Sequence, residues 1–227
     1  MSAPPRGKRE RNRAEMSRRI LTAVREMVVQ HGTTDFTMAE LAEAASVALA
    51  TPYKHFGSKS GLLSALLDVE HAREEAGSRL TSRERDGLEL THDFGVSRVR
   101  FYLQDSALFR PVFDGIFALD PQAELQPALG TPWIDLWEAG LRVAREAGDL
   151  AAGLEPHPIA HMLHLQFSMI LRRWAAGVAN DERFALETEH AIALVLSGVA
   201  APSRREVWPD HLRNTHGRLA VNDAAGR

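Results

Sequence analysis

The chain has no cysteine in 227 residues, and aromatic side chains make up only 7% of it. The lack of cysteine excludes a disulfide scaffold, a thiolate zinc site, a cysteine nucleophile and cysteine-ligated iron–sulfur clusters. No apolar run approaches the roughly 20 residues that a membrane span requires. The first residues contain no apolar segment of the kind found in secretory signals. We therefore expect a cytoplasmic protein with no membrane partner.

The common motifs of nucleotide binding and hydrolysis are also missing. There is no P-loop, no GxGxxG, no GxSxG and no HExxH. The segment GSKSG at residues 57–61 has a lysine where a nucleophile elbow needs a serine, and no predicted strand precedes it. We expect no catalytic residue, no bound metal and no cofactor, and hence a protein that is not an enzyme.

Positive charge is concentrated at the N-terminal end. Residues 1–60 hold ten Lys and Arg against six Asp and Glu, whereas residues 61–227 hold 17 against 24. A basic end on an acidic body is typical of a chain that meets a polyanion at that end. The alternative is a solvated charged tail with no partner.

Apolar residues recur at helical spacing along most of the chain. Met16, Ile20, Val24 and Met27, for example, predict an amphipathic helix that Gly32 stops. Strand-like alternation is scarce, and there is no repeat of 20–50 residues, so we expect an all-α fold of about nine helices. The predicted helices are 13–31, 38–45, 49–56, 58–77, 86–104, 106–118, 132–147, 158–177 and 184–200.

The pattern divides the chain into four parts. Residues 1–12 are predicted to be a disordered basic arm, and residues 13–60 a three-helix domain. Residues 61–201 would form a larger helical domain. Residues 202–227 turn polar, and we expect a poorly ordered tail in which only Trp208 docks.

Two short helices joined by a tight turn, 38–45 and 49–56, have the size of a helix-turn-helix. Thr37 and Glu40 match the capping box that opens the first of them. Helix 13–31 can cover the pair, since two short helices cannot bury each other. In this motif the second helix enters the major groove of DNA. Any other small helical subdomain remains an alternative on the pattern alone.

The stretch from Phe36 to Leu67, FTMAELAEAASVALATPYKHFGSKSGLLSALL, strongly resembles the TetR family of transcriptional regulators. The resemblance extends over about residues 14–70 and rests on the set rather than on any single position. Its marks are Thr37, Ala39, Leu41, Ala42, Ala45, Val47, Thr51, Tyr53, His55, Phe56, Ser58 and Lys59.

The resemblance implies roles in binding double-stranded operator DNA. Thr37, Tyr53, His55 and Lys59 would contact phosphates, while Leu49, Ala50 and Thr51 would face the groove. Lys54 could reach a phosphate or a guanine, and the arm that ends at Arg13 would touch phosphates or the minor groove. The full predicted set is Arg13, Thr37, Ala48, Leu49, Ala50, Thr51, Tyr53, Lys54, His55 and Lys59.

Three residues depart from the family pattern. Ser46 stands in the turn where glycine is usual, which costs about 1 kcal/mol if the backbone is left-handed. Ala48 stands where serine commonly caps the next helix, a loss of about 1 kcal/mol. Pro52 lies within that helix, where we expect it to remove one backbone hydrogen bond. We therefore expect a short or slightly distorted recognition helix.

The resemblance implies that the larger domain forms a homodimer and holds a small-molecule effector. Helix 184–200 is apolar beyond one stripe, which requires a second partner besides its own core. A second subunit would be that partner, and a fully buried core helix is the alternative. The predicted dimer contacts are Trp174, Ile192, Val195 and Val199. Aromatic residues on the middle helices favour an apolar effector. The predicted effector contacts are Phe101, Phe113, Phe117, Trp133, Trp137, His161, His164 and Phe167.

Three histidines, His157, His161 and His164, fall on one helical face. Two histidines four residues apart can bind a transition metal, and the three could instead anchor a polar group of an effector or be structural. Nothing nearby supports the metal, and no metal site is predicted.

We therefore expect a TetR-like regulator that acts as a repressor and is released from a palindromic operator by a small, largely apolar effector. Two alternatives remain. One is a small-molecule-binding helical protein whose DNA heads are degenerate, and the other is a helical metal protein or enzyme built on the three histidines.

Overall fold

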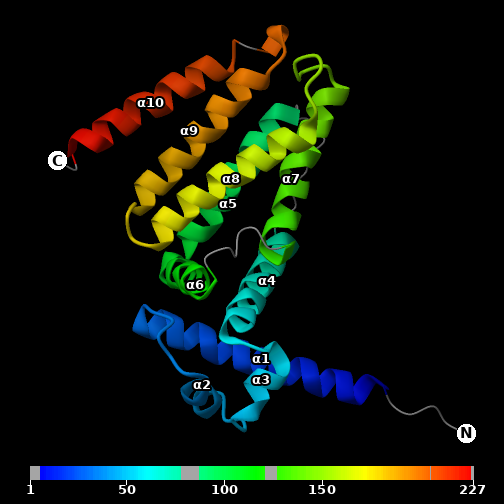
Figure 1. The fold of residues 1–227 in the computed structure, drawn as a ribbon, viewed down its shortest axis with the longest axis vertical. Helices are drawn as coiled ribbons and strands as arrows, with labels where there is room; N and C mark the ends of the chain where they lie inside the picture. The colour runs from blue at the N-terminus through cyan, green and yellow to red at the C-terminus, as the bar shows by residue number, and fades with distance from the viewer. Residues whose placement is uncertain (1–5, 78–86, 121–126, 205, 226–227) are drawn as a thin grey trace, which may run out of the picture. The chain divides into compact units, whose positions relative to one another are not determined.

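The computed structural model describes residues 6–77, 87–120, 127–204 and 206–225 (Figure 1). The described residues contain ten α-helices and no strand, apart from an isolated bridge between Leu150 and Ala200, so the predicted all-α fold is confirmed. The helices are α1 (Arg6–His31), α2 (Met38–Ala44), α3 (Ala50–Phe56), α4 (Lys59–Gly77), α5 (Gly87–Gln104), α6 (Ser106–Leu119), α7 (Pro127–Glu146), α8 (Pro156–Ala175), α9 (Asp181–Val199) and α10 (Trp208–Ala225). No helix of the described residues is both long and apolar enough to cross a membrane.

The chain divides into two compact units. Unit 1 comprises residues 1–78 and 111–121, and unit 2 comprises residues 79–110 and 122–227. The boundary predicted after residue 60 differs from this division, because all of α4 belongs with the first three helices. The chain also returns to unit 1 within α6, close to Pro111.

Unit 1 is built on the apolar stripe of α1. Ile20, Val24 and Val28, four residues apart, are fully buried, and Leu62 and Leu63 of α4 are buried as well. Helix α1 packs against both α2 and α4, and α3 packs against α2 and α4. The four helices therefore form the covered helix-turn-helix that the sequence predicts.

In unit 2, α5 packs against α7 at a close crossing. A Cβ added to Gly87 would lie 2.0 Å from the backbone nitrogen of Ala144, and one added to Gly140 would lie 2.5 Å from Thr91 Oγ1. Since real Cβ atoms do not approach other atoms this closely, the crossing requires glycine at both positions. It brings Trp137 of α7 into the interior, where it is buried.

Helix α9 lies between α8 and α10 and also packs against α5 (Figure 1). This arrangement explains why α9 is apolar beyond one stripe: α10 of the same chain covers a further side. The width of the apolar surface of α9 therefore does not require a second subunit, because α10 of the same chain covers part of that surface.

The two ends of the chain differ from the predictions. Residues 208–225, placed in a poorly ordered tail, form α10, whose first residue Trp208 is buried as expected. Helix α1 begins at Arg6, so residues 6–12 of the predicted disordered arm are helical, while residues 1–5 lie outside the described part. In both places the prediction of disorder rests on polar composition. That prediction is wrong because a polar sequence of helix-forming residues can form a helix without a broad apolar face. Helix α7 also begins five residues earlier than predicted, at Pro127.

Candidate nucleic-acid interface and ligand sites

Helix α2 opens with the predicted capping box. Thr37 Oγ1 accepts a hydrogen bond from the Glu40 backbone N–H at 3.2 Å, and Glu40 Oε2 accepts one from the Thr37 backbone N–H at 2.6 Å. Two orphan donors at the helix start are satisfied reciprocally. The bond from the Thr37 backbone lowers the pKa of the Glu40 carboxyl, so this side chain stays ionised at neutral pH.

The turn between α2 and α3 is a Schellman motif with serine in the glycine position. Ser46 N–H donates to Glu43 O and Val47 N–H donates to Ala42 O, both at 2.9 Å. Ser46 has φ of 51°, which confirms the left-handed conformation expected there. Arg19 of α1 fastens this turn, because its Nη2 donates to Ala45 O at 2.6 Å and to Ser46 O at 2.8 Å.

Helix α3 is short but carries no penalty from its proline. It begins at Ala50, so Pro52 is the third helical residue, where a backbone N–H has no acceptor within the helix. The expectation that Pro52 removes a hydrogen bond is therefore wrong. As predicted from Ala48, no side chain caps α3, and Leu49 occupies the cap position.

One face of α3 presents large side chains to solvent. Leu49 is 58% exposed and Tyr53 is 50% exposed, and Ala50 and Lys54 are exposed as well. Exposed apolar side chains of this size have nothing to bury them within unit 1. Thr51 is half-buried on the same helix. An uncapped helix with an exposed apolar, phenolic and cationic face fits the dimensions and chemistry of a DNA major groove.

The end of α3 contacts α1 through a polar pair. Ser17 Oγ lies 2.8 Å from His55 Nδ1. Burial lowers the pKa of His55, and the charges of Arg13 and Lys54 lower it further, so the ring is neutral at pH 7. Arg13 is exposed and close enough to act on His55, which places a predicted arm residue beside the recognition helix.

Lys59, at the start of α4, is occupied within the protein. Its Nζ donates to the Phe36 carbonyl oxygen at 2.7 Å and lies 4.6 Å from the centroid of the Phe36 ring. Burial lowers the pKa of this ammonium, although Asp35 and Glu40 oppose the effect. Lys59 therefore connects α4 to the segment before α2, a structural role that the sequence did not predict.

The predicted effector residues belong to both units. Phe113 and Phe117, buried on α6, belong to unit 1, whereas the other six belong to unit 2. Phe101 is not on the same helix as these two residues, because a turn at Asp105 ends α5 before α6 begins at Ser106. His161 is exposed on α8, and His164 is buried with Nε2 3.5 Å from Ser168 Oγ.

Four of the predicted residues do form an aromatic cluster on α5, α7 and α8. Trp137 packs edge-on against Phe94 at 4.8 Å between centroids and against Phe167 at 6.4 Å. The guanidinium of Arg98, which is buried, lies 4.6 Å from the Trp133 ring and 5.3 Å from the Phe101 ring. Trp137 Nε1 is buried and has no acceptor among the described residues. Sequence reasoning missed Phe94 and Arg98, although both lie at helical spacing from Phe101.

Comparison with known proteins agrees with this geometry. Residues 20–66, which span the helix-turn-helix, match the sequence model of bacterial regulatory proteins of the tetR family. A curated relative, the uncharacterised HTH-type transcriptional regulator YvkB of Bacillus subtilis (strain 168), is 26% identical over 200 residues, which are 82% of this chain and 97% of the relative. The helix-turn-helix of residues 20–66 is thus that of the TetR family of transcriptional regulators.

Solved structures of TetR-family proteins have the same fold. Thermus thermophilus FadR, a TetR-family repressor in complex with lauroyl-CoA, has a TM-score of 0.62 at 26% identity, covering 80% of this chain and 94% of its own. RolR in complex with resorcinol has a TM-score of 0.64 at 18% identity, covering 87% and 95%. The family is one of DNA-binding regulators and not of enzymes.

Two of the four predicted dimer contacts are internal to unit 2. Trp174 is fully buried, stacks on Phe184 at 4.7 Å between centroids, and donates from Nε1 to Asp181 Oδ1 at 2.8 Å. Ile192 is buried against α5, 2.3 Å from where a Cβ of Gly95 would stand. Both predictions are wrong in placing these side chains at the surface. Val195 and Val199 are half-buried on α9.

The exposed apolar side chains of α8 and α9 are different residues. Met162 and Met169, seven residues apart on α8, are 51% and 59% exposed, and Leu194 of α9 is 53% exposed. Helical spacing alone could have found them, but the sequence cannot tell which of several apolar stripes a neighbouring helix covers.

A cavity of about 240 Å³ lies between α5 and α9 in unit 2. It is lined by Val96, Val99, Arg100, Leu103, Ala185, Thr188 and Glu189. None of the predicted effector residues is among those that line it. No sequence pattern predicts this cavity, because its walls come from two helices that are about 90 residues apart in the chain.

Proposed function

We propose that this regulator is a dimeric repressor that binds a palindromic operator and leaves it when a small, largely apolar effector binds unit 2. The observation that carries the proposal is the exposed face of α3, where Leu49, Ala50, Tyr53 and Lys54 project from a helix-turn-helix with a basic α1 beside it. Lys54 would contact a phosphate or a guanine edge. Leu49 and Ala50 would contact thymine methyl groups, and Tyr53 a phosphate.

Selection of bound duplexes from a random DNA pool by the purified protein tests the operator. The proposal expects an inverted repeat whose half-sites are one helical turn apart, occupied by two protomers. Lys54→Ala should reduce affinity at least tenfold, and Arg218→Ala, which removes an exposed cation from α10, should not. Enrichment of no sequence, or equal loss in both variants, would contradict the assignment of α3 as the reading helix.

The proposed effector site is the aromatic cluster on α5, α7 and α8. Ligand sites are mostly apolar with a few polar groups that fix orientation. Phe94, Phe101 and Trp133 would supply the apolar walls, and the Arg98 guanidinium and the Trp137 indole N–H would supply the polar contacts. An indole N–H that is buried without an acceptor calls for an explanation, and an acceptor atom on the effector provides one.

Release of labelled operator by candidate compounds tests the effector. Because structural neighbours hold lauroyl-CoA and resorcinol, acyl-CoA thioesters and phenols form the first panel. Trp137→Phe keeps an aromatic ring and removes the donor, so an active effector should bind more weakly. Because the smaller ring leaves a void in the core, the free energy of unfolding should fall by about 0.5–3 kcal/mol, and it is measured alongside. An active effector whose affinity is unchanged by Trp137→Phe would exclude this cluster as the site.

Release would follow from a two-state equilibrium in which the effector binds one state more tightly. Helix α6 belongs to both units, and the division between them falls at Pro111. The chain therefore passes from unit 2, which holds the proposed effector site, into unit 1, which holds the helix-turn-helix, within one helix. A proline inside a helix removes a backbone hydrogen bond and allows a bend there. Operator DNA should weaken effector binding by the factor by which the effector weakens operator binding.

The alternative of degenerate DNA heads loses two of its three supports. Ser46 adopts the turn conformation and is fastened by Arg19, and Pro52 occupies a position that costs no hydrogen bond. Only the missing side-chain cap at α3 remains, and that costs about 1 kcal/mol.

A further inference from the structure

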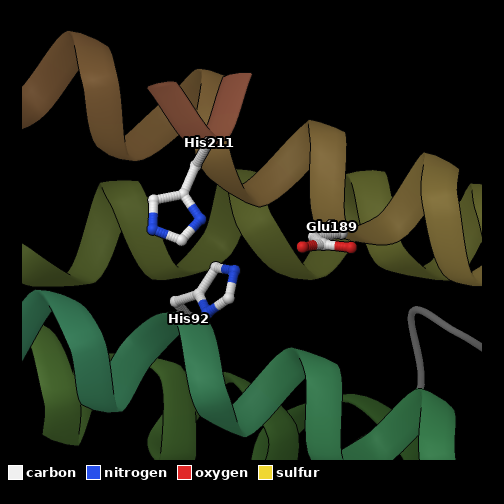
Figure 2. Close-up of side chains that lie close together, drawn as sticks. All are labelled: His92, Glu189 and His211. Atoms are coloured by element: carbon white, nitrogen blue, oxygen red, sulfur yellow. The ribbon is translucent and has the colours of Figure 1, made fainter. Parts of the chain in front are cut away.

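Three side chains of types that bind metal ions, from three helices of unit 2, lie close together (Figure 2). They are His92 of α5, Glu189 of α9 and His211 of α10, and one nitrogen or carboxylate oxygen from each lies within 4.8 Å of the other two. His92 and His211 face each other with ring centroids 5.5 Å apart, and the Glu189 carboxylate lies beside them. Their sequence separation of up to 119 positions left no pattern from which the cluster could be predicted.

The nitrogen atoms are placed to bind an ion. His92 Nε2 is buried and has no hydrogen-bond partner among the described residues, whereas its Nδ1 lies 3.5 Å from Asp93 Oδ1. A carboxylate beside one ring nitrogen favours the proton on that nitrogen and leaves the lone pair on the other. The lone pair of the buried Nε2 is then available to bind a metal ion.

The spacing suits one ion after small side-chain movements. Two imidazoles on a tetrahedral zinc, with Zn–N of about 2.0 Å, have ring centroids about 5 Å apart. The observed 5.5 Å between His92 and His211 is close to that value. The buried Trp208 ring packs against both imidazoles, with its centroid 5.7 Å from that of His92 and 5.6 Å from that of His211.

We propose that His92, Glu189 and His211 bind one divalent transition-metal ion of the zinc class, which fastens α10 to α5 and α9. Two imidazoles and a carboxylate form a ligand set that zinc uses in proteins, with the remaining position taken by water. Glu189 also lines the cavity of about 240 Å³ between α5 and α9, so there is space beside the cluster for that water. The site is distinct from the histidines of α8, where His157 instead pairs with Glu138 at 2.8 Å.

Hydrogen bonding between the three side chains does not explain why they lie together. No hydrogen bond joins His92, Glu189 and His211 in the described structure, while the neighbouring His190 has one, from its Nδ1 to Thr215 Oγ1 at 3.0 Å. His190 and His216, with centroids 5.7 Å apart, form a second histidine pair on α9 and α10. No third ligand residue joins that pair among the residues that the structure describes, so it serves as the internal control.

The test is Zn²⁺ titration of the full chain, without an affinity tag, after removal of metal by a chelator. Competition with a chromogenic chelator gives the stoichiometry and the Kd, and no DNA is used, so the result is separate from that of the repressor proposal. We expect one Zn²⁺ per chain and a rise in Tm of about 5–10 °C at a hundredfold excess over the Kd. Co²⁺ should give the visible absorption of a four- or five-coordinate site.

The variants His211→Ala and Glu189→Gln should each weaken Zn²⁺ binding at least tenfold and abolish the rise in Tm. Without metal, their Tm should match that of the parent within about 2 °C, since His211 is exposed and glutamine keeps the size of Glu189. His216→Ala and His157→Ala should bind Zn²⁺ like the parent. Absence of stoichiometric binding, binding that survives both ligand variants, or equal loss in His216→Ala would overturn the proposal.

Discussion

Ser17 of α1 and His55 of α3 are joined at 2.8 Å between Oγ and Nδ1, and this pair ties the recognition helix to the helix that covers it. With His55 neutral at pH 7, one ring nitrogen carries the proton, and in the tautomer whose Nδ1 accepts from the serine hydroxyl that nitrogen is Nε2. An N–H on the outer side of the ring is the group that a DNA phosphate needs as a donor. The partner of Nδ1 is a residue of α1 that the sequence did not single out.

This pair predicts a dependence of stability on pH. The pKa of His55 is lowered below its ordinary value of about 6.5 by burial and then by Arg13 and Lys54. The unfolded chain therefore binds a proton more readily than the folded chain as pH falls below 6.5. The stabilisation from His55 should be complete above that pH and should be lost as pH falls through the lower folded value.

Urea unfolding of the parent and of His55→Gln at pH 7.5, 6.5 and 5.5 measures this effect. The difference in free energy of unfolding between the two proteins should shrink from pH 7.5 to pH 5.5. A difference that stays constant would show that His55 does not resist protonation in the folded protein. The comparison cancels the titration of the other histidines, which both proteins share.

Lys59 and Lys54 should separate structure from DNA contact. Lys59→Met keeps the apolar stem against Phe36 but removes the ammonium donor, so the Phe36 carbonyl loses its partner and the free energy of unfolding should fall by about 1–2 kcal/mol. Lys54→Ala removes an exposed cation and should leave stability unchanged within about 0.5 kcal/mol. Equal stability of the two variants would contradict the structural role of Lys59.

The two lysines also differ in their expected effect on the salt dependence of DNA binding. Loss of one phosphate contact at Lys54 should reduce the slope of log affinity against log salt by about 1. Whether Lys59 adds a second such contact depends on its ammonium turning away from Phe36 in the complex. Measuring the slope for both variants at four salt concentrations determines which lysine releases counterions.

The crossing of α5 and α7 predicts contrasting effects of one substitution. Gly87→Ala would bring a Cβ within 2.0 Å of the Ala144 backbone, which cannot move without displacing α7, and should destabilise the protein by about 1–3 kcal/mol or more. Gly217→Ala, with nothing within 4 Å inside α10, should stabilise it by about 0.5–1 kcal/mol. Chemical denaturation of both variants checks this, and similar effects would contradict the close crossing.

The proposed dimer predicts which apolar residue matters. Leu194→Asp would place a charge on an exposed apolar position of α9 and should shift the protein to monomer at micromolar concentration. Val221→Asp changes an even more exposed apolar residue, on α10, and should leave the dimer intact. Sedimentation of the two variants compares them, and a monomeric parent or an unaffected Leu194→Asp variant would place the interface elsewhere.

Short-range sequence patterns predicted the helix-turn-helix of unit 1 well. The capping box of Thr37 and Glu40, the left-handed Ser46 and the missing cap of α3 all depend on residues within four positions of one another. The side-chain contacts of Arg19, Ser17 and Lys59 span 23 to 38 residues, and no short-range pattern indicates them.

The larger unit was predicted less well for a physical reason. Helical spacing shows that a residue lies on an apolar stripe, but it does not show which neighbour covers that stripe. The prediction of Trp174 and Ile192 as dimer contacts is wrong for this reason, because their own chain buries both side chains. The covering helix α10 was missed because a polar sequence can form a helix that packs with one narrow face.

The most direct test of the regulator is binding of the purified protein to the intergenic DNA beside its own gene, titrated at two salt concentrations with excess unrelated duplex. We expect competitor-resistant binding at two protomers per site for the parent and for Arg218→Ala, with at least tenfold weaker binding for Lys54→Ala. Binding that competitor DNA and salt erase, equally in all three proteins and at every inverted repeat tested, would contradict the claim that α3 reads DNA.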